Sequence, residues 1–557
     1  MRLGWSRSIR AFLLLLFSSL CAWPLPQTDP PAESEQLAAK YERLGLAAAQ
    51  KQDWASAVLE FRRAVKHAPK SASAHDLYGW ALAEAGQIDA GLAEISEAIA
   101  LDPERAEAHL HLGRALEKRR ELDGAIKAYQ EALRIRPAWA EVHDALGFLL
   151  GHRGNLVGAQ QEFERALKAK PDFPEAHYHL GVTLWFLKDT EGAISALQEA
   201  VRLRPDFSEA HHYLGLAFER QGKLEDAVEE LQAAARFDPR SAEIQNSLGK
   251  VLQSADYLVD AAEAFRRSLE LNPNSAEAHN SLGLILLKQG DGDGAIREFR
   301  AAEKLDSKFL AARNNLGLAL LQKAQWEDAV TTYRSLIELD AGSAEAHYNL
   351  GVAYKQMDRF EEATRALESA IGLDPALPEP HYTLGVIQWQ QGKLQEAAAQ
   401  FEAAIRARPD YQQAHYILGS VLRQQGDLEG ARKALETALH LDPNDAGAHQ
   451  ALGMVLRQEG NLPKAQAEFQ KAEALNKALA DTQAATLATN TGAKKLREGD
   501  LEGAMAQFQA ALKLAPDYAP AHFHLGLALR QKGDAGEARV EFQKALELNP
   551  RLKPPRE

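Results

Sequence analysis

Histidine recurs at a fixed spacing along the chain, which raises the question of a metal site or a series of catalytic bases. Eleven of the 18 histidines occupy one place in a 34-residue pattern: His75, His109, His143, His177, His211, His279, His347, His381, His415, His449 and His522. Metal ligands must converge on one ion at about 2 Å. No histidine has a partner three or four residues away, and equivalent side chains on neighbouring helices would be separated by roughly the 8–10 Å between helix axes. We therefore expect packed histidines that bond a neighbouring polar group, with no metal and no cofactor.

Other chemistry-bearing patterns are missing from the sequence. Cys21 is the only cysteine, which leaves no disulfide and no cysteine-ligated metal. There is no Gly-x-Ser-x-Gly, no His-Glu-x-x-His and no Gly-Lys-Ser/Thr phosphate loop. The sequence predicts a protein that is not an enzyme.

The elements that would position these histidines follow a strict period. Glycines recur every 34 residues from Gly45 to Gly453, and after one step of 39 residues Gly492 and Gly526 restore the spacing. This defines 15 repeats over residues 38–552, in which the glycine is position 8 and the histidine is position 4. Alanine dominates positions 20 and 27, a large apolar residue fills position 24, and proline is usual at position 32.

Each repeat predicts two antiparallel helices. Positions 4, 8 and 11 share one face of a first helix, whereas positions 20, 24 and 27 share one face of a second, and proline ends the second helix. A glycine within a helix costs about 1 kcal/mol relative to alanine, so its recurrence indicates close helix contact. One hairpin cannot bury its apolar face alone, and stacking on neighbours is therefore required.

This pattern closely resembles the tetratricopeptide repeat (TPR) family. The resemblance implies an all-α fold, a right-handed α-solenoid superhelix of about 15 helix-turn-helix units, with a concave groove lined mainly by the first helices. The tryptophan usual at position 4 of the family is mostly histidine in this chain.

Residues at positions 2, 5, 9, 12 and 13 of the first helices are expected to face the groove, and two asparagines at position 6 add to them. Position 5 is acidic early in the chain (Glu42, Asp76 and Asp144) and then changes to aromatic, amide and again aromatic residues. The candidate binding residues are Tyr178, Trp185, His212, Asn246, Asn280, Asn314, Asn315, Tyr348, Asn349, Tyr382, Trp389 and Tyr416. The alternative is that these tyrosines and asparagines are framework, which is common in the family.

The ends of the chain and one insertion complete the predicted organisation. Arginines before an apolar run predict a signal peptide over residues 1–22, with lipidation of Cys21 or an uncleaved anchor as alternatives. Residues 23–37 are expected to be a proline-rich linker, 38–479 repeats 1–13, 480–484 an insertion that lengthens a helix and acts as a hinge, 485–552 repeats 14 and 15, and 553–557 a tail. The last repeat has no polar capping helix, which suggests self-association there.

The sequence favours a non-enzymatic scaffold that binds extended protein segments in the groove. A periplasmic or secreted location follows from the signal peptide, and membrane association only if that segment is retained or Cys21 is lipidated. The formal net charge of −14 disfavours nucleic acid. Two other functions stay open: a structural component of a cell-envelope export or polysaccharide-secretion complex, and a polysaccharide-binding module.

Overall fold

The described part of the chain is entirely helical. A computed structural model describes residues 33–552, and no strand occurs among them. The predicted signal peptide, Cys21 and the tail lie outside these residues. Helix α1 begins at Glu33, before the predicted end of the linker, and an acidic residue such as Glu35 suits the first turn of a helix because of its dipole.

The described helices fall into two compact units, one ending at Leu305 and the other beginning at Asp306. We call them the N-terminal and the C-terminal array. The N-terminal array contains α1 (Glu33–Gln50), α2 (Trp54–His67), α3 (Ala72–Glu84), α4 (Ile88–Leu101), α5 (Ala106–Lys118), α6 (Leu122–Ile135), α7 (Ala140–His152), α8 (Leu156–Ala169), α9 (Pro174–Phe186), α10 (Thr190–Leu203), α11 (Ser208–Gln221), α12 (Leu224–Phe237), α13 (Ala242–Ser254), α14 (Leu258–Leu271), α15 (Ala276–Lys288) and α16 (Gly292–Leu305).

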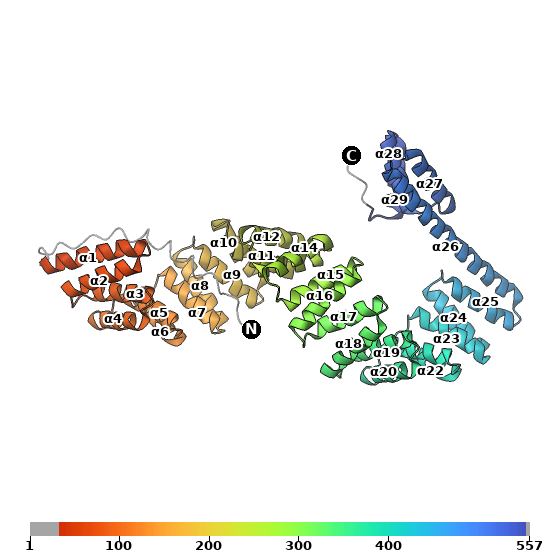
Figure 1. The fold of residues 1–557 in the computed structure, drawn as a ribbon, viewed down its shortest axis with the longest axis horizontal. Helices are drawn as coiled ribbons and strands as arrows, with labels where there is room; N and C mark the ends of the chain where they lie inside the picture. Colours follow the sequence, from red (N-terminus) through yellow and green to blue (C-terminus); the bar gives the residue numbers. More distant parts are fainter. Residues whose placement is uncertain (1–32, 553–557) are drawn as a thin grey trace. The chain divides into compact units, whose positions relative to one another are not determined.

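The C-terminal array contains α17 (Leu310–Gln322), α18 (Trp326–Leu339), α19 (Ala344–Gln356), α20 (Phe360–Leu373), α21 (Pro378–Gln390), α22 (Leu394–Ala407), α23 (Gln412–Gln425), α24 (Leu428–Leu441), α25 (Ala446–Gln458), α26 (Leu462–Arg497), α27 (Leu501–Leu514), α28 (Ala519–Lys532) and α29 (Ala535–Leu548). These helices are labelled in Figure 1. Two departures from the repeat pattern flank the boundary between the arrays. Before it, Glu303 stands at position 28, which is apolar in most repeats; after it, Ser307 replaces the usual proline of position 32.

Each repeat is the predicted helical hairpin, and its glycine lies against the large residue of the second helix. A Cβ atom added to Gly113 would lie 2.4 Å from Cε1 of Tyr129, and one added to Gly181 would lie 2.5 Å from Cγ of Leu197. Tyr129 and Leu197 are fully buried. The predicted close contact between the two helices is confirmed, and it explains why glycine recurs despite its cost in a helix.

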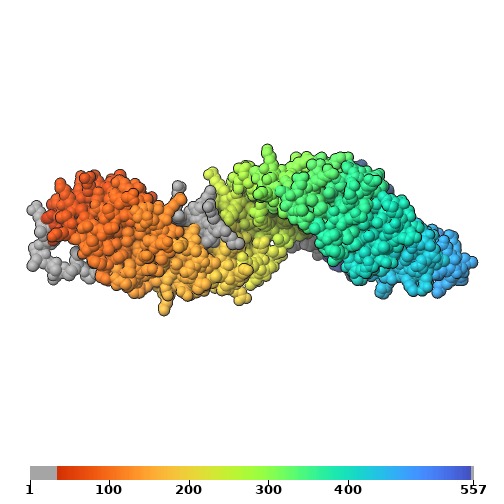
Figure 2. All heavy atoms as spheres, turned by 90° about the horizontal axis from the view of Figure 1, so that it is seen from below, coloured from red at the N-terminus to blue at the C-terminus, as the bar shows by residue number. Residues whose placement is uncertain are grey.

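The hairpins stack in sequence order within each array. The second helix of one repeat packs on the first helix of the next, as Leu133 of α6 does in a core cluster with Val142 and Leu146 of α7. First helices of successive repeats also adjoin, for example α3 with α5 and α19 with α21. In Figure 2 the sequence colours follow one another in order along the visible face of each array. We call the first helix of each repeat helix A, and the surface that these first helices form the helix-A face.

Helix α26 fuses the second helix of repeat 13 with the first helix of repeat 14. Its 36 residues run without interruption through the predicted insertion at 480–484, and Figure 1 shows it as one long helix between α25 and α27. The predicted lengthening of the helix is confirmed, whereas hinge motion at this place stays a prediction. Most residues from Glu473 to Ala484 are exposed, so no other helix covers the middle of α26.

Among the described helices, none combines the length and the apolar character that crossing a bilayer requires.

Candidate functional site

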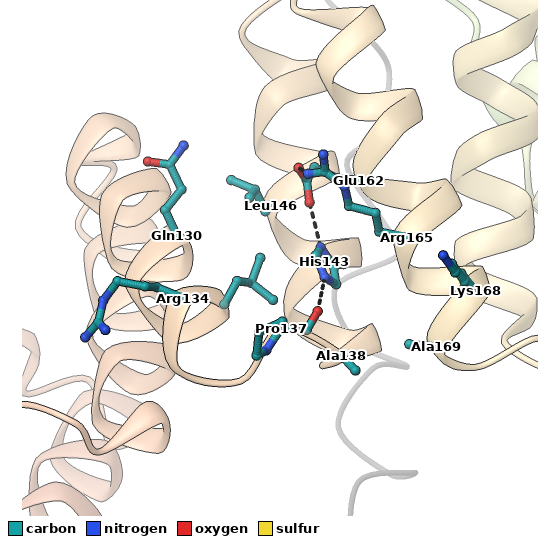
Figure 3. Close-up of a pocket in the computed structure, with 11 residues that line it drawn as sticks. Gln130, Arg134, Pro137, Ala138, His143, Leu146, Glu162, Arg165, Lys168 and Ala169 are labelled. Atoms are coloured by element: carbon teal, nitrogen blue, oxygen red, sulfur yellow. Dashed lines mark hydrogen bonds and ion pairs between the residues drawn. The ribbon is translucent and has the colours of Figure 1, made fainter.

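The recurring histidines tie the two helices of a repeat to the turn that precedes them. His143 Nδ1 lies 2.6 Å from Oε2 of Glu162, and its Nε2 lies 2.9 Å from the carbonyl oxygen of Pro137. Figure 3 shows the ring between these two partners. The same pair of contacts occurs at His75, His211, His279, His449 and His522. These histidines are framework residues, as expected from the sequence.

The histidine–glutamate pairs alternate along the N-terminal array. His75, His143, His211 and His279 stand 68 residues apart, and each has a glutamate 19 residues later. The histidines of the intervening repeats have alanine at that place, as His109 has Ala128. The structural period of this array is therefore a pair of repeats.

A second set of bonds joins successive first helices in the same two-repeat period. Asp76 at position 5 of α3 is fully buried and accepts bonds from Arg105 Nε at 2.9 Å and from His111 Nδ1 at 2.6 Å. Burial by itself raises the pKa of Asp76, but His111 and Arg105 outweigh it and lower the pKa below its ordinary value. Asp144 bonds His179 at 2.8 Å in the next pair of repeats. Asp76 and Asp144 are thus buried between helices and do not line an open groove, whereas Glu42 is partly exposed.

Four of the candidates are buried, and one of them, His212, bonds across the same kind of seam between first helices. His212 Nε2 lies 2.9 Å from Oγ of Ser247, and burial lowers the pKa of His212 to about 4. Tyr178, Asn280 and Asn349 are also buried, each no more than 9% exposed. The remaining eight candidates are partly exposed: Trp185, Asn246, Asn314, Asn315, Tyr348, Tyr382, Trp389 and Tyr416.

The aromatic candidates Tyr178 and Trp185 form one cluster with Tyr213 in the N-terminal array. The ring centroid of Tyr213 lies 6.1 Å from that of Tyr178 and 5.8 Å from that of Trp185. The guanidinium of Arg220 lies 4.1 Å from the Trp185 ring centroid, so one face of the indole is covered by a cation. Tyr213 was missed from the sequence because only asparagines were singled out at position 6 of the repeat, which it occupies.

The aromatic candidates Tyr382 and Trp389 lie in the C-terminal array. The rings of Tyr382 and Tyr411 are 5.1 Å apart, and Trp389 Nε1 donates to Oε1 of Gln424 at 3.1 Å. Arg408 lies 5.0 Å from the Tyr411 ring and pairs with Glu379. Tyr178 and Trp185 thus both contact Tyr213, and Tyr382 and Trp389 pack against one core cluster.

Several buried polar atoms of the helix-A face have no hydrogen-bond partner within the described chain. They include Asn246 Oδ1, Asn314 Oδ1, Asn349 Nδ2 and Trp185 Nε1. All four residues were predicted as candidates from the sequence. An unpaired buried polar group costs about 1–3 kcal/mol. These four atoms have almost no surface open to solvent, so they do not themselves offer bonds to an external ligand.

A row of glutamines on the helix-A face was not singled out from the sequence. Position 13 is glutamine in the five successive repeats 9 to 13: Gln322, Gln356, Gln390, Gln424 and Gln458. All five side chains are exposed. Their spacing of 34 residues is the signal that would have revealed them.

A cavity of about 710 Å³ lies away from these residues, between α6, α7 and α8 (Figure 3). Two of the cations that line it are paired with carboxylates, Arg165 with Glu162 and Arg134 with Glu131. In the described part of the chain, no group of three or more histidine, cysteine or acidic side chains is arranged to hold a metal ion.

Sequence models of known repeat families match most of the chain. Models described as tetratricopeptide repeat match residues 42–95, 344–377, 382–446, 422–480 and 519–552, and a TPR repeat model matches 320–358 and 494–533. The C-terminal domain of cilia and flagella-associated protein 70 matches residues 105–313. No curated protein matches the chain.

Solved TPR-like structures resemble the chain at low identity. YrrB, described as a TPR protein with an unusual peptide-binding site, is 22% identical over 34% of this chain and 97% of its own, with a TM-score of 0.32. PilF of Pseudomonas aeruginosa is 21% identical over 38% of this chain and 96% of its own, with a TM-score of 0.35. MamA of Desulfovibrio magneticus RS-1 is 21% identical over 30% and 96%, with a TM-score of 0.29. The chain belongs to the tetratricopeptide repeat family, whose α-solenoids generally serve as protein-interaction scaffolds.

Proposed function

We propose that this protein is a non-enzymatic scaffold that binds extended protein segments on its helix-A face. The carrying observation is that each array presents partly exposed aromatic and amide side chains on its first helices. They include Trp185 and Asn246 in the N-terminal array and Asn314, Tyr348, Tyr382 and Tyr416 in the C-terminal array. The backbone of an extended peptide offers both N–H donors and C=O acceptors, and an amide side chain can bond either of them.

The charges of this face support a protein ligand over a nucleic acid. A row of glutamates occupies position 2 of six successive repeats in the N-terminal array: Glu107, Glu141, Glu175, Glu209, Glu243 and Glu277. Some of them pair with cations, as Glu175 does with Arg204 at 2.9 Å. Together with the net charge of −14, this row opposes a phosphate backbone.

The aromatic residues fit a peptide better than a polysaccharide. Stacking on a sugar requires an open ring face, but Arg220 covers one face of Trp185. Trp389 is fixed through its indole N–H to Gln424. We propose in addition that the protein is exported through residues 1–22. Fractionation of cells that produce the full chain tests this location.

Selection from a peptide library tests the proposed function and does not require that the natural partner be identified first. The full chain is immobilised, peptides displayed on phage are enriched on it, and their affinities are measured by isothermal titration calorimetry. We expect Asn246→Ala or Asn314→Ala to weaken selected peptides about fivefold, because one hydrogen bond contributes roughly 1 kcal/mol. The matched control is Gln160→Ala, a partly exposed amide on the second helix α8 that bonds Glu164 within that helix.

Two outcomes would overturn the proposal. One is the failure of any peptide to enrich on the full chain. The other is that enriched peptides bind equally well to all helix-A variants, which would place their site elsewhere.

A further inference from the structure

Three successive repeats of the N-terminal array neutralise the glutamate at position 2 in the same way. In repeat 5, Arg204 at position 31 lies 2.9 Å from Glu175 and its guanidinium lies 3.5 Å from the ring centroid of Phe207 at position 34. Repeats 3 and 4 repeat this arrangement with Glu107, Arg136 and Trp139 and with Glu141, Lys170 and Phe173. Each glutamate therefore has a cation that also stacks on an aromatic ring.

The next two repeats keep the glutamate but lose the cation. Position 31 is Asp238 in repeat 6 and Asn272 in repeat 7, and position 34 is serine in both. Glu209 and Glu243, at position 2 of these repeats, form no ion pair within the described part of the chain. Glu277 of repeat 8 is paired again, with Lys250 at 2.5 Å. Two neighbouring carboxylates of the row are thus left without a cation.

Two tyrosine rings lie beside these carboxylates. Helix α11 carries both Glu209 and Tyr213, one turn apart on one face, and it contacts α9, which carries Tyr178, and α13, which carries Glu243. The pKa of Tyr178 is raised by burial first and then by Tyr213, Glu209 and Glu243. Burial and Glu243 raise the pKa of Tyr213 to about 12. The two carboxylates therefore act on the same pair of phenol groups.

The patch keeps bonding capacity that is open to a ligand. Glu243 is exposed, and Glu209 and Tyr213 are partly exposed. Tyr178, which is 8% exposed, lies beneath Tyr213, with 6.1 Å between the ring centroids. Neither tyrosine hydroxyl has a hydrogen-bond partner among the described residues. A phenol oxygen and a carboxylate both accept hydrogen bonds, so the patch suits a ligand with several N–H donors.

The cations of the surrounding elements are engaged elsewhere or form no pair with these carboxylates. Arg204 pairs with Glu175, and Lys250 pairs with Glu277. Arg220 donates to the carbonyl oxygen of Trp185 at 2.5 Å and covers its indole ring. Arg240, in the turn before α13, is exposed and forms no ion pair in the described chain. The charge of Glu209 and Glu243 is therefore available to an external cation.

We infer that Glu209, Tyr213 and Glu243 form a binding site for an arginine side chain of the protein segment held on the helix-A face. The ligand guanidinium takes the place that position 31 has in repeats 3 to 5: it pairs with the carboxylates and stacks on an aromatic ring. Arginine suits the site because its planar group carries five N–H donors. The inference rests on the proposed function, since it names a side chain that the N-terminal array selects.

Fluorescence anisotropy with labelled hexaarginine tests the inference on the full chain. Hexacitrulline, in which a neutral urea group replaces each guanidinium, is the comparison probe. We expect saturable binding of hexaarginine that is about tenfold tighter, because charge-assisted bonds are lost in hexacitrulline. The double substitution Glu209→Gln and Glu243→Gln should weaken hexaarginine about tenfold for the same reason. Glu229→Gln with Glu263→Gln changes the net charge equally at two exposed positions of α12 and α14 and should leave the affinity unchanged.

A second variant tests whether the ligand replaces the missing internal cation. Asn272→Arg gives repeat 7 the cation that repeats 3 to 5 have at position 31. The new guanidinium should pair with Glu243 and compete with the ligand, so that hexaarginine binds about threefold more weakly. Gln232→Arg, the same change of charge at an exposed position of α12, is the matched control and should have no such effect.

The outcomes separate this inference from the broader proposal. Equal affinity for the two peptides, or equal effects of the two double substitutions, overturns the arginine site. If library-selected peptides still bind the chain in that case, the scaffold function stands and only the arginine assignment fails. Far-ultraviolet circular dichroism of each variant confirms that its helices are intact.

Discussion

His211 Nδ1 lies 2.6 Å from Oε2 of Glu230, while its Nε2 lies 3.0 Å from the carbonyl oxygen of Pro205. A carboxylate and a carbonyl both accept, and a neutral imidazole has only one N–H. Both ring nitrogens of His211 can donate to these acceptors only when the imidazole carries a second proton and is therefore charged. Burial lowers the pKa of His211, but the bonds to Glu230 and Pro205 outweigh it, and the net shift is upward from 6.5.

The first prediction concerns the pH dependence that this shift creates. A histidine whose pKa is raised on folding stabilises the protein fully below about pH 6.5, and the contribution is lost as pH rises through the raised value. Glu230→Ala should move the pKa of His211 below its ordinary value, because burial then dominates. Nuclear magnetic resonance titration of ¹³C-labelled histidine measures the shift. Glu229→Ala, at an exposed neighbouring position, serves as the control, and an unchanged pKa in Glu230→Ala would falsify the assignment.

A second prediction follows from the buried carboxylate of Asp76. Asp76→Ala removes the partner of Arg105 and His111, and breaking such a buried pair costs about 3 kcal/mol. Since the pKa of Asp76 is lowered, its contribution is present above about pH 3.8 and is lost as pH falls through the lowered value. Urea denaturation at neutral and acidic pH measures both effects. Asp89→Ala breaks an exposed pair with Arg119 and should cause no measurable change; equal effects of the two substitutions would contradict the prediction.

A third prediction concerns the glycine of the repeat. Gly113→Ala would place a Cβ atom 2.4 Å from the buried Tyr129 ring, and we expect destabilisation of about 1–3 kcal/mol despite the better helix propensity of alanine. Gly372→Ala is the control because nothing lies within 4 Å of its added Cβ in α20. That variant should be more stable by about 0.5–1 kcal/mol. Thermal denaturation of both variants shows whether the helix propensity of alanine or the packing against Tyr129 determines the stability of Gly113→Ala.

A fourth prediction concerns the exposed centre of α26. An isolated helical segment is marginally stable in water, and residues 474–484 gain little from packing. Their amides should exchange with deuterium faster than those of α25 and α27, as measured by mass spectrometry. Limited proteolysis should cut the same segment and leave folded fragments. Protection equal to that of α25 would argue against a hinge.

The helical hairpins could be predicted from the sequence because one physical pattern recurs in every repeat. Glycine at position 8, alanine at 20 and a large residue at 24 determine the contact between the two helices, and Gly113 and Tyr129 show it directly. The junction at α26 also had a readable signal. Thr491 replaces the leucine of position 7, and Glu473 replaces the apolar residue of position 28, which are the positions that pack in the α6–α7 cluster at Leu146 and Leu133.

The candidate site was less predictable because it depends on the alignment of neighbouring helices. Helical periodicity places position 5 on the helix-A face, but it does not reveal the residue 35 positions later that approaches it. Asp144 and His212 are buried for this reason, through His179 and Ser247. The glutamine row carries neither charge nor an aromatic ring, and its regularity emerges only when position 13 is compared across five successive repeats.

The two-repeat period of the N-terminal array has a consequence for how the chain can be shortened or copied. Removal of residues 140–207 takes out one whole pair of repeats and leaves the bonds Asp76–His111 and His212–Ser247 within their own pairs. Removal of residues 106–139 alone would bring Ala145 to the place of His111 and leave Asp76 without its imidazole. Duplication of paired repeats preserves every such bond, so this array has the pattern expected of a lineage that grew two repeats at a time.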